Sequence, residues 1–156
     1  PRIGKMGIIA SLQPMQMPSD RALIQLATGK REKFAFPLWD ILRNGAILAL
    51  GSDAPVESPN PFWGIHAAVT RSRQGDPDPA GVWMAEQRIS LQAALEGYTT
   101  GPAFAGWMEN QLGKLAPGYL ADLIVLDQDI FDIPPQEIYR LQPSAVMFDG
   151  KWVWQR

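Results

Sequence analysis

The chain has 156 residues, of which 46% are hydrophobic, and this length and composition are typical of one globular domain with its own core. Its net charge is -2 and it has no run of Lys and Arg, which argues against binding to nucleic acid or to an anionic membrane. It has no cysteine, which excludes disulfides and thiolate metal ligands and is typical of a reducing compartment. We therefore expect a cytoplasmic protein with neither a membrane nor a nucleic acid as partner.

The first element that the sequence predicts is a buried strand. Residues 7–12 form a short apolar run that ends at Gln13-Pro14, a pattern typical of a parallel sheet. The chain reaches this strand after only a few residues and without a start methionine. We therefore expect it to be an excised or truncated piece of a longer protein.

A helix, a second helix and a second buried strand follow. Ser19 and Asp20 predict a cap for a helix over residues 21–27, and Asn44-Gly45 predicts the end of a helix over residues 38–43. Residues 46–50 are apolar on both faces, as in a central parallel strand. Asn60-Pro61 then predicts the start of a helix that reaches about residue 73.

The last third of the chain changes from helices to strands. Ser90 predicts the cap of a helix over residues 91–96, and a last short helix is expected over residues 103–108. Strands are expected at Leu115, at Leu120 and over residues 123–126, 145–148 and 152–154, the last two joined by an Asp149-Gly150 hairpin. The sequence thus predicts an α/β portion over residues 1–110 and an antiparallel β portion over residues 111–156. The first portion alone is too short for a closed barrel of eight strands, which takes about 250 residues.

Three polar residues near the ends of the apolar strands are candidates for chemistry. Asp53 follows the strand at residues 46–50, where parallel α/β folds place catalytic groups, but it could equally cap the turn at Pro55. Gln16 follows the first strand at a similar distance and could bind a ligand or satisfy loop backbone. Glu57 could contact a substrate or be a solvated charge.

The only histidine does not indicate a metal centre. His66 lies within the helix after Pro61, and the chain has no second histidine and no cysteine to complete a zinc site. The sequence also shows no nucleophile elbow and no phosphate-binding glycine loop.

Several motifs together resemble one known family. They are Gly-Ser-Asp-Ala-Pro-Val-Glu at 51–57, Asn-Pro at 60–61, Gly-Ile-His-Ala-Ala-Val-Thr-Arg at 64–71, Ser-Leu-Gln-Ala-Ala-Leu-Glu-Gly-Tyr-Thr at 90–99, Gly-Lys-Leu-Ala-Pro-Gly-Tyr-Leu-Ala-Asp-Leu-Ile-Val-Leu-Asp at 113–127 and the hairpin at 149–151. This set resembles the metal-dependent amidohydrolase superfamily, in its YtcJ-like amidohydrolase 3 branch, which includes N-substituted formamide deformylases. The resemblance covers essentially the whole chain.

The resemblance implies a fold and a cofactor. Family members have a distorted TIM barrel with one or two divalent metals, usually zinc, at the carboxyl ends of its strands, and a small β-sandwich beside it. By this likeness the chain is the C-terminal portion of the barrel, strands six to eight, followed by a small β-sandwich portion. Residues 7–12 would be strand six, residues 46–50 strand eight, and the chain from Leu115 onward the sandwich. Strands one to five, with their metal ligands, would be missing.

The resemblance also implies roles for Asp53 and Gln16. Asp53 would match the strand-eight aspartate, which binds the metal, takes a proton from the activated water and passes it to the leaving nitrogen. Gln16 falls where the family has a metal-binding histidine. An amide oxygen replaces imidazole poorly at zinc, so this departure predicts one metal or weak binding.

Two functional hypotheses follow. In the first, the chain is a fragment of a metal-dependent hydrolase that acts on non-peptide C–N bonds of a small amide or formamide, and is inactive alone. In the alternative, it is a non-catalytic truncated module. Its open strand edges predict a homo-oligomer or a complementing, missing N-terminal half.

Overall fold

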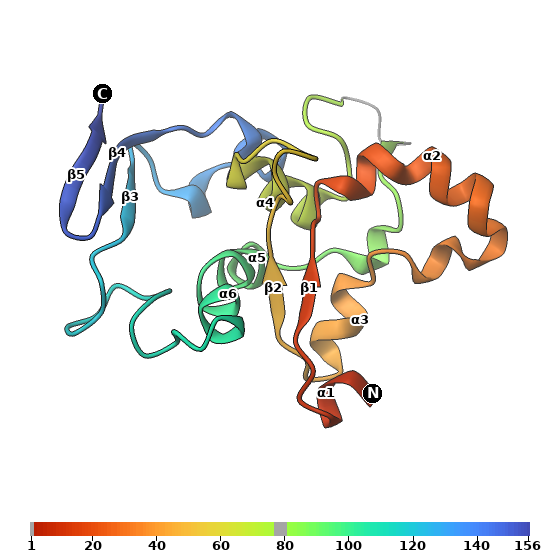
Figure 1. Ribbon diagram of the computed structural model, residues 1–156. Coiled ribbons are helices and arrows are strands. Elements are labelled where there is room, and N and C mark those ends of the chain that lie inside the picture. Colours follow the sequence, from red (N-terminus) through yellow and green to blue (C-terminus); the bar gives the residue numbers. More distant parts are fainter. Residues whose placement is uncertain (1, 77–80) are drawn as a thin grey trace.

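The computed structural model describes residues 2–76 and 81–156, which form two small sheets with helices between and around them (Figure 1). The α-helices are α1 (Arg2–Lys5), α2 (Gln16–Thr28), α3 (Leu38–Arg43), α4 (Pro61–Thr70), α5 (Leu91–Tyr98) and α6 (Thr100–Ala105). The 3-10 helices are η1 (Gly29–Phe34), η3 (Ala85–Gln87), η4 (Ile130–Asp132) and η5 (Pro135–Arg140). The strands are β1 (Ala10–Leu12), β2 (Leu48–Leu50), β3 (Leu123–Leu126), β4 (Pro143–Phe148) and β5 (Lys151–Gln155).

The first sheet consists of β1 and β2, which pair directly and in parallel. Ala10 lies opposite Leu48, and Leu12 lies opposite Leu50. The expected strands are therefore present, but their numbering as six and eight is wrong, because a seventh strand would have to lie between them. The connection between them is formed by α2, η1 and α3 and holds no strand. The described chain thus has two neighbouring parallel strands instead of three.

Caps and turns that the sequence predicts are mostly confirmed. The Asn60 side chain accepts a hydrogen bond from the backbone N–H of Phe62 at 3.0 Å, and that of Ser90 accepts one from Ala93 at 3.1 Å. These bonds satisfy backbone N–H groups that have no partner in the first helical turn. α3 ends before Asn44-Gly45, as expected.

Helix α2 begins earlier than predicted. It starts at Gln16 and not at residue 21, and its N-cap residue, Met15, makes no side-chain cap bond. The Ser19 hydroxyl donates to the Met15 carbonyl at 3.5 Å, so it lies within the first turns of the helix. The prediction that Ser19 or Asp20 caps this helix was therefore wrong, and Gln16 stands at the helix start.

The second sheet is antiparallel, in the order β3-β4-β5, and lies to one side of the molecule (Figure 1). The hairpin at Asp149-Gly150 is confirmed, since β4 ends and β5 begins on either side of it. No strand forms at Leu115 or Leu120, and α6 covers residues 100–105 where a helix over 103–108 was expected. The predicted β-sandwich is therefore represented by a single three-stranded sheet among the described residues.

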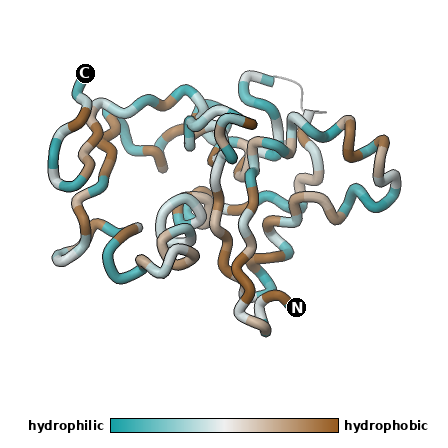
Figure 2. The backbone as a smooth tube through the Cα atoms, viewed as in Figure 1, coloured by the Kyte–Doolittle hydropathy of each residue, from teal (hydrophilic) through white to brown (hydrophobic). Residues whose placement is uncertain are grey.

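The main core lies around the parallel strands and α4. It includes Leu38, Leu48, Ile65 and Ile138, all 3% exposed or less. Figure 2 shows hydrophobic residues along both parallel strands, and those of β2 are all buried. η5 packs on α4, so Ile138 joins the core of the first portion although it follows residue 110. The division into portions at residues 110 and 111 remains a prediction.

None of the helices in the described part of the chain has the length and apolar character needed to span a bilayer.

Candidate functional site

Gln16 and Asp53 meet at the carboxyl ends of the two parallel strands. Because β1 and β2 are parallel and in register, the segments that follow them leave the sheet at the same edge (Figure 1). Gln16 opens α2 just after β1, and Asp53 follows β2 at a similar distance. The Gln16 Nε2 atom donates to Asp53 Oδ2 at 3.4 Å. The two residues that the sequence singles out separately therefore form a pair.

The turn that carries Asp53 is held by three hydrogen bonds. The Gly51 N–H donates to the Leu12 carbonyl of β1 at 3.2 Å, and the Tyr98 hydroxyl donates to the Gly51 carbonyl at 3.4 Å. The Val56 N–H donates to the Asp53 carbonyl at 2.8 Å. Within the described residues, the backbone carbonyl of Asp53 thus accepts the bond that closes the turn, and its carboxylate accepts a hydrogen bond from Gln16. The contact found for the Asp53 carboxylate among the described residues is thus with a side chain and not with a backbone N–H of the turn, and its role stays a prediction.

The Asp53 side chain is exposed to solvent, whereas the backbone just before it is hydrogen-bonded to β1. Asp53 is exposed and adopts a left-handed backbone, with φ of 57°. Non-glycine residues rarely adopt this conformation, and when they do they often occur at functional sites. Gln16 is half-buried between Met15 and Met17, both buried. The pair therefore combines an exposed carboxylate with the amide of a half-buried side chain.

The described residues do not make up a metal site by themselves. The described ranges, 2–76 and 81–156, contain no group of three His, Cys, Asp or Glu residues that could hold a metal. Asp53 fits as one carboxylate ligand. Gln16 turns its nitrogen toward Asp53, whereas a metal shared by both residues would require its oxygen. Divalent cations need more ligands than this pair supplies, so no reaction step can be derived through a metal held by these residues alone.

Glu57 is half-buried in the segment after the turn, and nothing in the structure tests its predicted contact with substrate.

His66 lies in the buried core. It is 2% exposed in α4, and its ring meets the ring of Tyr139 edge-on, with centroids 5.3 Å apart. Burial lowers the pKa of His66 to about 4, so its imidazole is neutral at pH 7. Its Nδ1 atom has no hydrogen-bond partner among the described residues. His66 is therefore a buried residue of the folded core.

Sequence reasoning missed the part played by two residues. Burial raises the pKa of Tyr98, so its hydroxyl remains protonated and available as the donor to Gly51. Arg71 is fully buried, and it donates to the carbonyls of Phe36 and Trp83 at 3.0 Å each. These bonds join residues 35 and 12 positions apart, which no local sequence pattern indicates.

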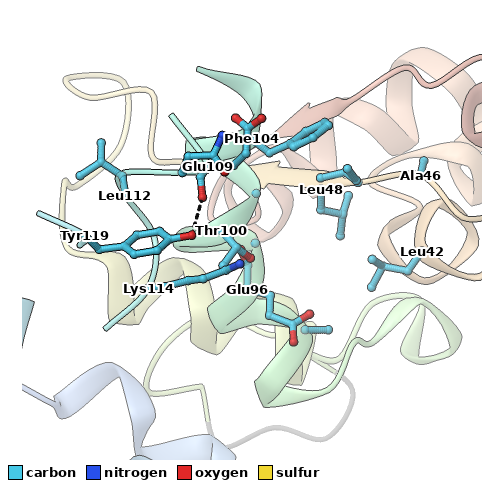
Figure 3. A pocket seen from close by; sticks show the side chains of 15 residues that line it. Leu42, Ala46, Leu48, Glu96, Thr100, Phe104, Glu109, Leu112, Lys114 and Tyr119 are labelled. Carbon is cyan, nitrogen blue, oxygen red and sulfur yellow. Dashed lines mark hydrogen bonds between the residues drawn. The ribbon is translucent and has the colours of Figure 1, made fainter. Parts of the chain in front are cut away.

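A separate cavity of about 430 Å³ lies at the other end of β2 (Figure 3). Leu42, Ala46 and Leu48 line one side, and Lys114 and Tyr119 the opposite side (Figure 3). The Tyr119 hydroxyl donates to the Glu109 carbonyl at 3.0 Å. Ala46 to Leu48 lead into β2, whereas Asp53 follows it, so this cavity is distinct from the Gln16–Asp53 pair.

Two solved structures with a similar fold are described as hydrolases. An uncharacterized metal-dependent hydrolase from Pyrococcus horikoshii OT3 matches 86% of this chain with a TM-score of 0.72 and 27% identity, over 27% of its own length. An amidohydrolase from Thermotoga maritima MSB8 matches 99% of the chain with a TM-score of 0.68, over 33% of its length, and at 18% identity it supports the fold alone.

Sequence comparison agrees with the structural comparison. The amidohydrolase YtcJ of Bacillus subtilis, whose function is assigned only provisionally, is 32% identical over 99% of the chain and 29% of its own length. Protein LONG AFTER FAR-RED 3 of Arabidopsis thaliana is 35% identical over 84% of the chain, and the N-substituted formamide deformylase of Arthrobacter pascens is 30% identical over 78%. The chain spans less than a third of the length of these relatives.

The model of the Amidohydro_3 amidohydrolase family matches residues 1–154. The chain belongs to this family, and the resemblance found in its motifs is confirmed.

Proposed function

We propose that this chain is the C-terminal part of a metal-dependent hydrolase that cleaves non-peptide C–N bonds of small amides or formamides. The observation that carries the proposal is the Gln16–Asp53 contact at the carboxyl ends of parallel strands, in a chain that matches the amidohydrolase family over residues 1–154. Parallel α/β folds place catalytic groups at this end of the sheet. The deformylase among the relatives supports the substrate class.

In this proposal Asp53 both contributes to a divalent metal site, for which zinc is the expected ion, and handles a proton. A metal held there with further ligands would make a water molecule more acidic, lowering its pKa toward about 7. The exposed Asp53 carboxylate accepts a proton from the attacking water and returns it to the leaving nitrogen. Gln16 orients the carboxylate through its N–H bond to Oδ2. The remaining metal ligands would come from polypeptide outside this chain.

The same proposal assigns β1 and β2 to two neighbouring strands of a barrel. Their direct parallel pairing supports this assignment. The unpaired edges of both small sheets would be covered by an N-terminal part of the protein, or by a second copy of the chain when that part is missing. We expect the chain alone to lack hydrolase activity.

The proposal can be tested by complementation. The purified chain, the longer polypeptide that contains it, and a mixture of the chain with the preceding part would be assayed for bound metal by mass spectrometry and for hydrolysis of an N-substituted formamide. We expect stoichiometric metal and turnover in the longer polypeptide or the mixture, and neither in the chain alone. A metal-free, inactive longer polypeptide would contradict the proposal and favour a non-catalytic module.

A further inference from the structure

Tyr98, the last residue of α5, reaches across to the end of β2. Its hydroxyl donates to the carbonyl of Gly51, the first residue after the strand, at 3.4 Å. Its side chain is half-buried, and burial raises the pKa of the hydroxyl further above its ordinary value. The bond joins residues 47 positions apart, so it is part of the tertiary structure and not of a local turn.

This bond completes the anchoring of Gly51 on two sides. The Gly51 N–H is held by the Leu12 carbonyl on β1, and its carbonyl is held by Tyr98 on α5. Asp53 stands two residues further along, exposed and in a left-handed conformation. Only Ser52 stands between Gly51 and Asp53, so a displacement of Gly51 moves the backbone that carries the carboxylate.

Two glycines in the neighbouring helices allow close contacts at the end of β2. A Cβ atom at Gly64, in α4, would overlap the hydroxyl, and a Cβ at Gly97 would meet the side chain of Leu50 at 2.7 Å. The glycines at these positions therefore allow α4 and α5 to approach the end of β2 closely enough for the bond to form. Interiors are packed densely enough that such a contact transmits small displacements.

We propose that Tyr98 is a positioning residue, whose hydrogen bond to Gly51 fixes the Asp53 carboxylate against Gln16. This role rests on the function proposed above for the Gln16–Asp53 pair, because it describes how that pair is aligned. Tyr98 itself touches neither residue in this account and acts through the backbone of the turn.

The test compares two tyrosines that each donate to a backbone carbonyl. Tyr98→Phe removes the bond to Gly51 and retains the ring, while Tyr119→Phe removes the bond to Glu109 at the opposite end of β2. The readout is the NMR signal of the Gln16 side-chain amide, and specifically its change when Asp53 is replaced by Asn. This readout reports the contact between Gln16 and Asp53, which a general loss of packing elsewhere would not alter.

In the otherwise unchanged chain and in the Tyr119→Phe variant, we expect Asp53→Asn to shift the Gln16 amide signal equally. In the Tyr98→Phe variant, we expect the same replacement to cause less than half of that shift. Gly64→Ala, which retains the tyrosine but displaces its hydroxyl, should reproduce the Tyr98→Phe result. If Gly64→Ala does not fold, Tyr98→Phe decides alone. An undiminished response in Tyr98→Phe would overturn the inference.

The measurement requires neither metal nor substrate. A failure of the proposed hydrolase activity would therefore leave the NMR result standing, and a negative NMR result would leave the proposed activity open to its own test.

Discussion

The strands of the two sheets are covered very differently. All three residues of β2 are buried, between 3% and 7% exposed, under α5 and α6 and beside β1. Every residue of β5 is exposed, including Trp152, Val153 and Trp154 at 44% to 59%. Both strands are rich in apolar residues, so the difference lies in the available cover and not in composition. The comparison teaches that the helices around β2 cover its apolar side chains, whereas the antiparallel sheet leaves apolar side chains of β5 exposed.

The largest expected difference between the regions is in the cost of removing a core side chain. Ile138 and Val153 both follow residue 110, but Ile138 is fully buried against α4, whereas Val153 is 59% exposed. We expect Ile138→Ala to lower the free energy of unfolding by about 3 kcal/mol and Val153→Ala by no more than about 0.5 kcal/mol. Urea denaturation of both variants measures this. Equal losses would contradict the assignment of η5 to the main core.

A smaller loss is expected from a buried cation in the same core. Arg71→Met retains the apolar stem but leaves the carbonyls of Phe36 and Trp83 without their donor. We expect a loss of about 2–3 kcal/mol in the free energy of unfolding. Arg73→Met, two residues away on the surface, is the matched control and should change stability by less than about 0.5 kcal/mol.

The buried His66 predicts a dependence of stability on pH. Its pKa is lowered to about 4 in the folded chain, whereas an unfolded histidine titrates near about 6.5. The unfolded state therefore binds a proton first, and stability falls as the pH drops from about 6.5 toward 4. Between pH 7 and pH 5 we expect a loss of about 2 kcal/mol from this group.

The control for this pH effect is simple because His66 is the only histidine. His66→Phe retains a ring against Tyr139 and removes the titration. Urea denaturation at both pH values should show the loss shrink by about 2 kcal/mol in the variant. An unchanged pH dependence would show that His66 is accessible to protons in the folded chain.

The smallest expected effect comes from helix caps in the two regions. Asn60 caps α4 in the main core, and Asp129 accepts from the Phe131 N–H at the start of the short η4. We expect Asn60→Ala to cost about 1 kcal/mol and Asp129→Ala about half of that, because η4 has only one turn to lose. Thermal unfolding of the two variants measures both losses. A larger loss for Asp129→Ala than for Asn60→Ala would contradict this expectation.

Local signals allowed the sequence to predict much of the fold. Asn60, Ser90 and the Asp149-Gly150 turn each act on neighbouring backbone, so their chemistry is visible in a few residues. The strands expected at Leu115 and Leu120 failed because apolar residues also occur in exposed loops, and these two leucines are 78% and 42% exposed.

The candidate site could be predicted only in part. Asp53 and Gln16 were identified because each follows an apolar strand, and parallel strands bring such positions together. Tyr98 escaped detection because its partner, Gly51, is distant in sequence and offers a backbone carbonyl, which every residue has. The pairing of β1 directly with β2 also depends on tertiary structure, so a resemblance of motifs could not fix the strand numbering.

The most direct test of the account is the replacement of Asp53 in the complete hydrolase proposed above. Asp53→Asn should lower kcat/KM for an N-substituted formamide by about 10²–10⁴-fold, the usual contribution of a general acid–base group, with unchanged thermal stability. Asp127→Asn, which removes the carboxylate that pairs with Arg156 in the antiparallel sheet, should leave kcat/KM unchanged. Full activity of Asp53→Asn would contradict the claim that this carboxylate carries the chemistry.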